Sequence, residues 1–301
     1  MKYAAAILFG AFLFSCGDSE KERGLQTKAK REQQMKEYES AFKVAVMPTI
    51  DCLPIYLLKD SMLYDTTKVD IRLRRYKAQM DCDTALVGGS VQGSATDLVR
   101  SERLKSKGLS LEYVAATNAH WKLIANKRAR LKELSQFSDK MIAMTRYSAT
   151  DLLTDKAMMH AKTKYPAYKI QINDVELRLR MLIGNEMDAA WLPEPQATEA
   201  RIAGHNLLMD SQKDSLSLGV VAFRKTDLSE KRRRQELDEF VRAYDRACQL
   251  INQHGIGYYS ALIQKYMNAD RQVVEALPKM TFDRAFSPKP KNIAQAQAFL
   301  H

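Results

Sequence analysis

The chain has 301 residues, of which 46% are hydrophobic, a fraction typical of a folded globular protein. Its formal charge is +11, and such a basic excess is often found in nucleic-acid-binding proteins. The basic residues are scattered, however, apart from a run at 231–234 that opens an amphipathic helix and is typical of a solvated first turn. The composition therefore favours a folded body and predicts no nucleic-acid partner.

The first residues have the layout of a secretory signal peptide. A short basic start is followed by an apolar run over residues 4–14, too short for a membrane span of about 20 residues. The run ends at Ser15-Cys16, in a pattern that resembles a bacterial lipobox, where the cysteine is acylated and becomes the mature N-terminus. We predict a signal peptide at residues 1–15 and a lipid anchor on Cys16. The alternative is an ordinary signal peptide with an incidental cysteine.

Residues 16–41 are charged and polar, with almost no aliphatic side chains. Such a stretch cannot bury enough apolar surface to offset its ordering entropy. We predict a tether or a loose helix that lets the folded body stand off the membrane at its extracytoplasmic face.

The body begins with alternating strands and helices. Short apolar or alternating runs predict strands at 43–46, 69–73, 84–87 and 111–116, the third of them closed by Gly88-Gly89. Helices are expected from Pro54 and over 94–104. This alternation predicts βαβ units and a parallel sheet covered by helices on both faces.

A second set of the same kind begins at residue 140. Strands are predicted at 141–144, 168–172 and 188–192, and helices at 148–164 and 175–183. A strand at 218–223 and a long amphipathic helix from residue 229 follow, because apolar residues recur there at three- and four-residue steps. Shorter helices are expected over 258–267, 270–277 and 292–300.

Four segments carry a family resemblance. VMPTIDCLPIY at 46–56 resembles a first strand with its ligand loop, and DTALVGGS at 83–90 is similar to a "D-x-A-x-x-G" strand and turn. LKEL at 131–134 followed by YSATDLL at 147–153 resembles an "L-x-D-L" helix with a hydroxyl-rich turn, and GNEMDAAWLPEP at 184–195 resembles a "G-x-x-D-A-A-x-x-x-E-P" block. Their order and spacing resemble the bacterial solute-binding proteins for sulfonates, nitrate, bicarbonate and thiamine pyrimidine precursors.

The resemblance implies an α/β fold of the type II periplasmic-binding-protein class, with two lobes, each a mainly parallel sheet flanked by helices. Lobe one would comprise residues 42–126 and a return over 216–301 that includes the C-terminal helices, and lobe two residues 127–215. The family's role implies a monomeric, lipid-anchored component of an ABC-type uptake system. It would capture a small anionic or zwitterionic molecule by hinge closure and deliver it to a membrane permease.

In open α/β sheets, ligands bind beyond the carboxyl ends of the strands. That rule selects four loops as the candidate ligand site. The candidates are Thr49, Asp51, Cys52, Ser90, Gln92, Ser148, Ala149, Thr150, Trp191 and Glu194.

Each candidate also has a purely structural interpretation. Ser148 or Thr150 could simply cap a helix, and Asp51 could form a turn. Trp191 could lie in the core, and Glu194 could stabilise the hinge. If they contact ligand, the hydroxyls at the helix start favour an anionic group, whereas Asp51 and Glu194 favour an amine, so that a zwitterion would satisfy both.

The remaining patterns predict no catalytic residue, metal site or cofactor. The three cysteines of the body, Cys52, Cys82 and Cys248, lack metal-ligand spacing, and no H-E-x-x-H, G-x-S-x-G or P-loop is present. Placed at opposite ends of the predicted sheet, Cys52 and Cys82 are expected not to pair. Two alternatives stay open, a lipoprotein sensor or interaction module and an enzyme related to thiamine-pyrimidine synthesis.

Overall fold

The computed structural model describes the backbone of residues 20–214 and 216–300 and the side chains of residues 27–213 and 216–300. The chain divides into two compact units, residues 1–41 and 42–301. The predicted signal peptide and Cys16 lie outside the described residues. In the first unit, α1 (Glu20–Ser40) is a helix whose described side chains are almost all exposed, as expected of a charged segment with no apolar face. No helix within the described ranges is long and apolar enough to cross a membrane.

The first sheet of the second unit has the strand order β2-β1-β3-β10-β4. Its strands are β1 (Phe42–Val46), β2 (Ile71–Arg75), β3 (Gly93–Asp97), β4 (Leu111–Ala116) and β10 (Gly219–Arg224). β1 runs parallel to β2 and β3, whereas β10 is antiparallel to both β3 and β4. Four of the five strands therefore point the same way, and their carboxyl ends share one edge.

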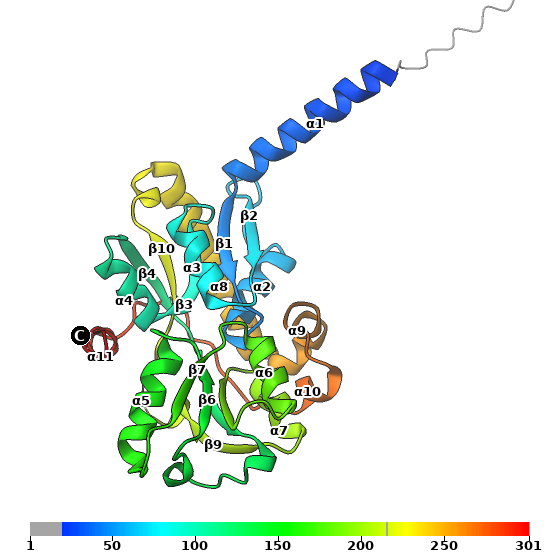
Figure 1. Cartoon of the computed structure of the whole chain (residues 1–301). Helices are drawn as coiled ribbons and strands as arrows, with labels where there is room; N and C mark the ends of the chain where they lie inside the picture. Colours follow the sequence, from blue (N-terminus) through cyan, green and yellow to red (C-terminus); the bar gives the residue numbers. More distant parts are fainter. Residues whose placement is uncertain (1–19, 215, 301) are drawn as a thin grey trace, which may run out of the picture. The chain divides into compact units, whose positions relative to one another are not determined.

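The second sheet repeats this plan with the order β7-β6-β8-β5-β9. Its strands are β5 (Lys122–Ala125), β6 (Met141–Met144), β7 (Tyr168–Gln171), β8 (Ala189–Leu192) and β9 (Asn206–Asp210). β6 is parallel to β7 and β8, and β5 is antiparallel to β8 and β9. Figure 1 shows the two sheets as separate lobes, with β1 to β4 in one and β6, β7 and β9 in the other.

Helices flank both sheets. Those of the first lobe are α2 (Leu53–Asp60), α3 (Gln79–Val87), α4 (Leu98–Ser106), α8 (Lys231–His254), α9 (Ser260–Met267) and α11 (Pro290–Ala298). The second lobe has α5 (Ala149–Ala161), α6 (Val175–Ile183) and α7 (Gln196–Ile202), and the short α10 (Arg271–Glu275) contacts α7. The long amphipathic α8 packs on α2, and α11 packs on α4. The predicted α/β class with two sheets flanked by helices is confirmed.

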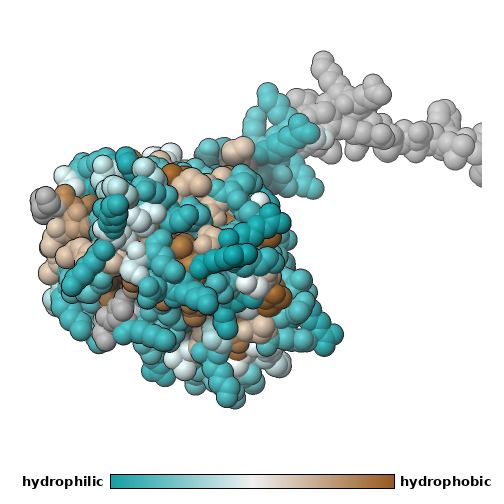
Figure 2. Space-filling model, turned by 60° about the horizontal axis from the view of Figure 1, so that its bottom comes forward, coloured by the Kyte–Doolittle hydropathy of each residue, from teal (hydrophilic) through white to brown (hydrophobic). Residues whose placement is uncertain are grey.

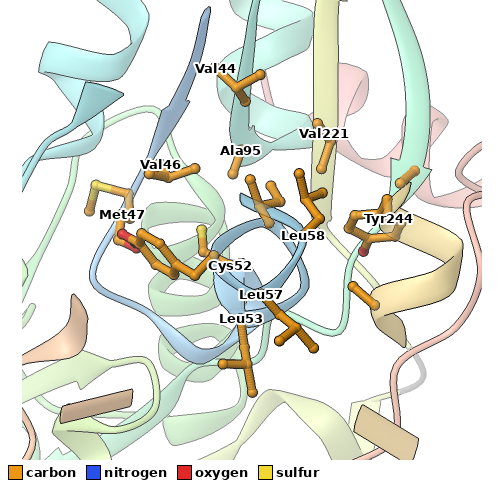
Figure 3. Close-up of a cluster of buried hydrophobic side chains, with 14 of the residues drawn as sticks. Val44, Val46, Met47, Cys52, Leu53, Leu57, Leu58, Ala95, Val221 and Tyr244 are labelled. Carbon is orange, nitrogen blue, oxygen red and sulfur yellow. Dashed lines mark hydrogen bonds between the residues drawn. The ribbon is translucent and has the colours of Figure 1, made fainter. Parts of the chain in front are cut away.

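The core of the first lobe lies between the sheet and α2 and α8. Every residue of β1 is buried, as expected for a strand covered on both faces. Figure 3 shows Val44 of this strand on the side of α2 toward which Leu58 points. The rings of Phe42 and Phe223 stack beside this cluster. On the face drawn in Figure 2, hydrophilic residues predominate and the hydrophobic patches are small and separate.

One strand was predicted in the wrong place. Residues 84–87 form the last turns of α3 rather than a strand, and the strand is β3 (Gly93–Asp97), where a helix was expected to begin. A short apolar run does not by itself distinguish strand from buried helix. β3 begins with a glycine because Gly93 lies under the ring of Phe223, where a Cβ would clash with the ring.

The strands β5 and β9 were not predicted. Because β5 pairs with β8 and β9, the chain enters the second sheet before Lys122, earlier than the predicted boundary at residues 126/127. It returns to the first sheet between Asp210 and Gly219. The chain therefore crosses between the sheets at 117–121 and again at 211–218.

Candidate ligand-binding cleft

A cavity of about 50 Å³, here called the cleft cavity, lies where the carboxyl ends of the strands in the two lobes face each other. The first lobe contributes Met47, Thr49, Asp51, Cys52, Gln79, Ala95, Thr96 and Asp97; the second contributes Thr145, Ser148, Thr150, Asn173, Val175, Arg178 and Pro193; the first crossing contributes Ala119 and Trp121. One water needs roughly 10–15 Å³ by the same measure. The cleft cavity therefore has room for a molecule of only a few heavy atoms.

The two lobes contact each other around this cavity. The Ile50 amide donates to the Glu194 carbonyl at 2.8 Å, and Gln196 Nε2 donates to the Pro48 carbonyl at 2.9 Å. On the other side of the cavity, Lys77 Nζ lies 2.6 Å from Glu176 Oε2, and Ala78 and Asp174 form an isolated β-bridge. These contacts join the lobes on either side of the cavity.

The start of α5 forms the hydroxyl-lined wall that the sequence predicts. Ser148 is the N-cap, and its Oγ accepts from the Thr150 amide at 3.1 Å and donates to the Thr145 carbonyl at 2.7 Å. Thr150 Oγ1 accepts from the Thr145 amide at 3.0 Å. The capping interpretation is therefore correct, and both hydroxyls also line the cavity. Ala149 is buried and does not line it.

Two carboxyl groups of the first lobe face the cavity. Asp97 ends β3, caps α4 by accepting from the Arg100 amide at 3.0 Å, and accepts a further hydrogen bond from the Ala149 amide across the cleft. Burial raises the pKa of Asp97 to about 6, although the charge of Arg100 opposes that shift. Burial also raises the pKa of Asp51, which receives a hydrogen bond from Thr49.

The second lobe contributes a buried cation. Arg178 of α6 donates from Nε to the Ile172 carbonyl at 3.0 Å, from Nη1 to the Trp191 carbonyl at 2.8 Å, and from Nη2 to Thr145 Oγ1 at 2.6 Å. These partners are neutral, and no carboxylate among the described residues forms an ion pair with Arg178. Burial lowers the pKa of Arg178 to about 10, so the guanidinium stays charged at neutral pH.

Cys52 lies at the same wall as Asp51. Thr49 Oγ1 lies 3.8 Å from its sulfur, and burial raises the pKa of its thiol well above the usual value. Figure 3 shows that sulfur among the apolar side chains under β1. Cys52, Cys82 and Cys248 are all buried free thiols. The argument that placed Cys82 just before a strand was wrong, because it belongs to α3.

Five predicted site residues line the cleft cavity together: Thr49, Asp51, Cys52, Ser148 and Thr150. Ser90 and Gln92 do not. They precede β3, at the opposite edge of the sheet, because the strand was predicted one element too early. There, Gln92 Oε1 accepts from the Lys43 amide at 2.8 Å, and Ser90 Oγ donates to the Ala85 carbonyl at 3.2 Å.

Trp191 and Glu194 also lie outside this cavity. Trp191 is fully buried in the core of the second lobe, and its Nε1 donates to Thr154 Oγ1 at 2.9 Å. Successive side chains of a strand point to opposite faces of the sheet, and Trp191 lies on the face of β8 that packs into the core. The ligand-platform interpretation was therefore wrong. Glu194 forms an ion pair with Lys122 at 2.9 Å and accepts from the Thr198 amide at 3.0 Å, both contacts within the second lobe.

The sequence interpretation missed Asp97 and Arg178. Asp97 could have been found as the polar residue that ends a strand, had β3 been placed correctly. Arg178 lies on a helix that was predicted correctly, but nothing in its local pattern distinguishes it from a solvated arginine. No group of three or more His, Cys, Asp or Glu side chains that could hold a metal occurs within the described ranges.

No family model and no curated protein matches the sequence. Among solved structures, the ligand-binding component of an ABC-type import system from Staphylococcus aureus, with zinc bound, has a TM-score of 0.74 at 16% identity, covering 87% of this chain and 92% of that one. The alkanesulfonate-binding protein from Xanthomonas axonopodis pv. citri, bound to MOPS, has a TM-score of 0.71 at 16% identity, covering 86% and 91%. The periplasmic nitrate-binding protein from Synechocystis has a TM-score of 0.71 at 12% identity, covering 87% and 80%. These similarities show that the chain has the periplasmic-binding-protein fold.

Proposed function

We propose that this chain is the solute-binding component of an ABC-type uptake system and that it binds a small zwitterion between its two lobes. The fold shared with import and anion-binding proteins supports the general role. One observation carries the choice of ligand. Across the cleft cavity, the first lobe presents two carboxyl groups, Asp51 and Asp97, and the second presents the guanidinium of Arg178.

Opposite charges on opposite lobes suit a ligand that carries both. Burial opposes the ionisation of Asp97 and Asp51. An ammonium group of the ligand beside these two carboxylates would compensate their negative charge. A carboxylate or sulfonate facing Arg178 would accept a charge-assisted hydrogen bond from the Nη1 hydrogen that remains free, because the other four N–H groups already donate to Ile172, Trp191 and Thr145. The volume of about 50 Å³ limits the solute to the smallest molecules of this class.

Solute entry requires that the lobes separate. The contacts that such a hinge motion must break include the hydrogen bonds of Ile50 to Glu194 and of Gln196 to Pro48, and the pairing of 77–78 with 174–176. They also include the hydrogen bonds from the Ala149 amide to Asp97 and from Arg100 Nη1 to the Arg146 carbonyl. A zwitterion that bridges Asp97 and Arg178 interacts with both lobes only when they are together, so its binding favours the closed arrangement.

We further propose that Cys16 carries the lipid anchor that holds the protein at the extracytoplasmic face, where a membrane permease receives the solute. The 21 residues of α1 would span about 30 Å as a polar spacer between anchor and body. In this role the protein acts as a monomer, uses no cofactor and catalyses no reaction.

A thermal-shift screen tests the proposal. The panel comprises small amino acids, aminosulfonates, inorganic anions and simple amines. A ligand that binds only the folded state adds about 2.7 kcal/mol of stability at a hundredfold excess over its Kd. We expect zwitterions to raise the Tm of the wild type and of Asp238→Asn, a control on the exposed face of α8, but not of Asp97→Asn. No shift with any compound would favour the sensor or interaction module instead.

A further inference from the structure

A second and larger cavity, here called the crossing cavity, has a volume of about 720 Å³. It is lined by the first crossing with its flanking residues 116 and 122, and by Gln212 and Ser217 of the second crossing. The C-terminal segment 278–286, which Figure 1 shows between α10 and α11, completes the lining. Its volume lies within the range of about 300–1,000 Å³ that is usual for small-molecule sites. An occupant would contact both lobes.

The two cavities share one wall. In an extended segment successive side chains point to opposite faces, and here Ala119 and Trp121 line the cleft cavity while His120 and Lys122 line the crossing cavity. In the same way, Pro193 lines the cleft cavity and Glu194 lines the crossing cavity. The crossing cavity is therefore a separate site, with a set of side chains that the proposed solute-binding role does not use.

Two polar atoms of this lining, Asn118 Oδ1 and His120 Nδ1, are buried without a hydrogen-bond partner among the described residues. The amide oxygen of Asn118 is an acceptor only. Burial lowers the pKa of His120, so the neutral ring can also present an acceptor at Nδ1. Since buried polar atoms in native proteins are nearly always paired, the two together favour an occupant that donates hydrogen bonds.

The fixed charges favour a positively charged donor. Lys122 Nζ lies 2.9 Å from Glu194 Oε1 and 3.6 Å from Asp210 Oδ2, so one ammonium faces two carboxylates. The exposed Lys279 and Asp283 at the C-terminal segment cancel each other. The cluster of Lys122, Glu194 and Asp210 therefore carries one net negative charge, and Glu194 is its carboxylate that lines the cavity.

The remaining walls are mixed. Thr117, Gln212, Ser217 and Thr281 add polar side chains, and an apolar part is formed by Ile50, Ile256, Met280 and Phe286. A ligand that fits both parts has a cationic head and an apolar body. We propose that the crossing cavity is a second ligand site, which takes a small organic amine with its ammonium group at Glu194 and Asn118 and its apolar body against Met280 and Phe286.

Benzylamine is a suitable probe, and benzyl alcohol is its neutral counterpart. Benzylamine is too large for the cleft cavity as it stands. In calorimetric titrations of the full chain we expect benzylamine to bind and benzyl alcohol to bind about tenfold more weakly or not at all, because it lacks the charge-assisted hydrogen bond. No benzylamine binding, or equal binding of the two compounds, overturns the proposal.

Variants then locate the site. Glu194→Gln keeps the shape but removes the charge, and Asn118→Leu removes an acceptor from a partly exposed side chain and leaves the Lys122 ion pairs intact. Each should weaken benzylamine binding about tenfold, whereas Asp97→Asn at the cleft cavity should leave it unchanged. Loss of binding in Asp97→Asn with retention in both other variants would place the amine in the cleft cavity and contradict the proposal.

Discussion

Replacing Asp97 with asparagine should make the unliganded protein more stable at neutral pH while abolishing solute binding. The carboxyl group is buried, and its strongest neighbouring cation, Arg100, is already paired with Asp83. Asparagine is also a good N-cap, so it can still accept from the Arg100 amide at the start of α4. The change therefore removes a charge that burial disfavours and keeps the local structure.

The magnitude follows from the pKa of Asp97, about 6 in the folded protein against an ordinary value of 3.8. Because the folded state holds the Asp97 proton more tightly than the unfolded state does, the free energy of unfolding falls as pH rises from about 4 to 6. The total loss above pH 7 is about 3 kcal/mol. Asparagine has one acceptor oxygen for two amides, Arg100 and Ala149, and the lost hydrogen bond costs about 1 kcal/mol. The variant should therefore be less stable by about 0.5 kcal/mol at pH 4 and more stable by about 2 kcal/mol at pH 8.

Urea denaturation of both proteins at pH 4, 6 and 8 measures this difference, with equal m-values required for the comparison. Asp238→Asn serves as the control, because it replaces an exposed carboxyl group on α8. The difference in unfolding free energy between this variant and wild type should change by less than about 0.5 kcal/mol over the same pH range. If the stability of Asp97→Asn relative to wild type does not increase with pH, the buried-carboxylate account of the cleft is refuted.

Three further outcomes are expected. Trp191→Phe leaves the Thr154 hydroxyl without its donor and should lower the free energy of unfolding by about 1–3 kcal/mol, while solute binding by the folded variant stays unchanged. Gly93→Ala places a Cβ against the ring of Phe223 and should cost about 1–3 kcal/mol or more by the same denaturation assay. The three buried cysteines should react with a thiol reagent at pH 8 only at the rate of opening or unfolding, because burial raises the pKa of each thiol; fast reaction of any of them would contradict this placement.

Much of the fold could be predicted because periodicity and turn residues are local signals. β1 and the amphipathic α8 follow directly from their apolar patterns. The strand at Gly93–Asp97 could not be read in this way. Its residues Ser94, Ala95 and Thr96 have low hydrophobicity, and they form a buried strand between β1 and β10, through pairing with residues far apart from them in the sequence.

The candidate site was predictable where it depends on helix starts and strand ends. Ser148 and Thr150 combine a capping pattern with a place at a strand's carboxyl end, and both line the cavity. The role of Trp191 was not predictable, because only the packing of β8 shows which face of the strand meets the core. Arg178 reaches the cleft from within a helix, through hydrogen bonds to carbonyl groups of two other segments that the sequence does not place near it.

Calorimetric titration with matched ligand sets tests most directly whether the cleft binds a zwitterion. Each set comprises a zwitterion and its two truncated analogues, for example 2-aminoethanesulfonate with ethanesulfonate and ethylamine, or glycine with acetate and methylamine. We predict that one zwitterion binds and that removing either charged group weakens binding at least about tenfold, because Asp97 or Arg178 then faces no counter-charge. A bare anion that binds as tightly as its zwitterion would contradict the assignment of Asp51 and Asp97 to ligand recognition.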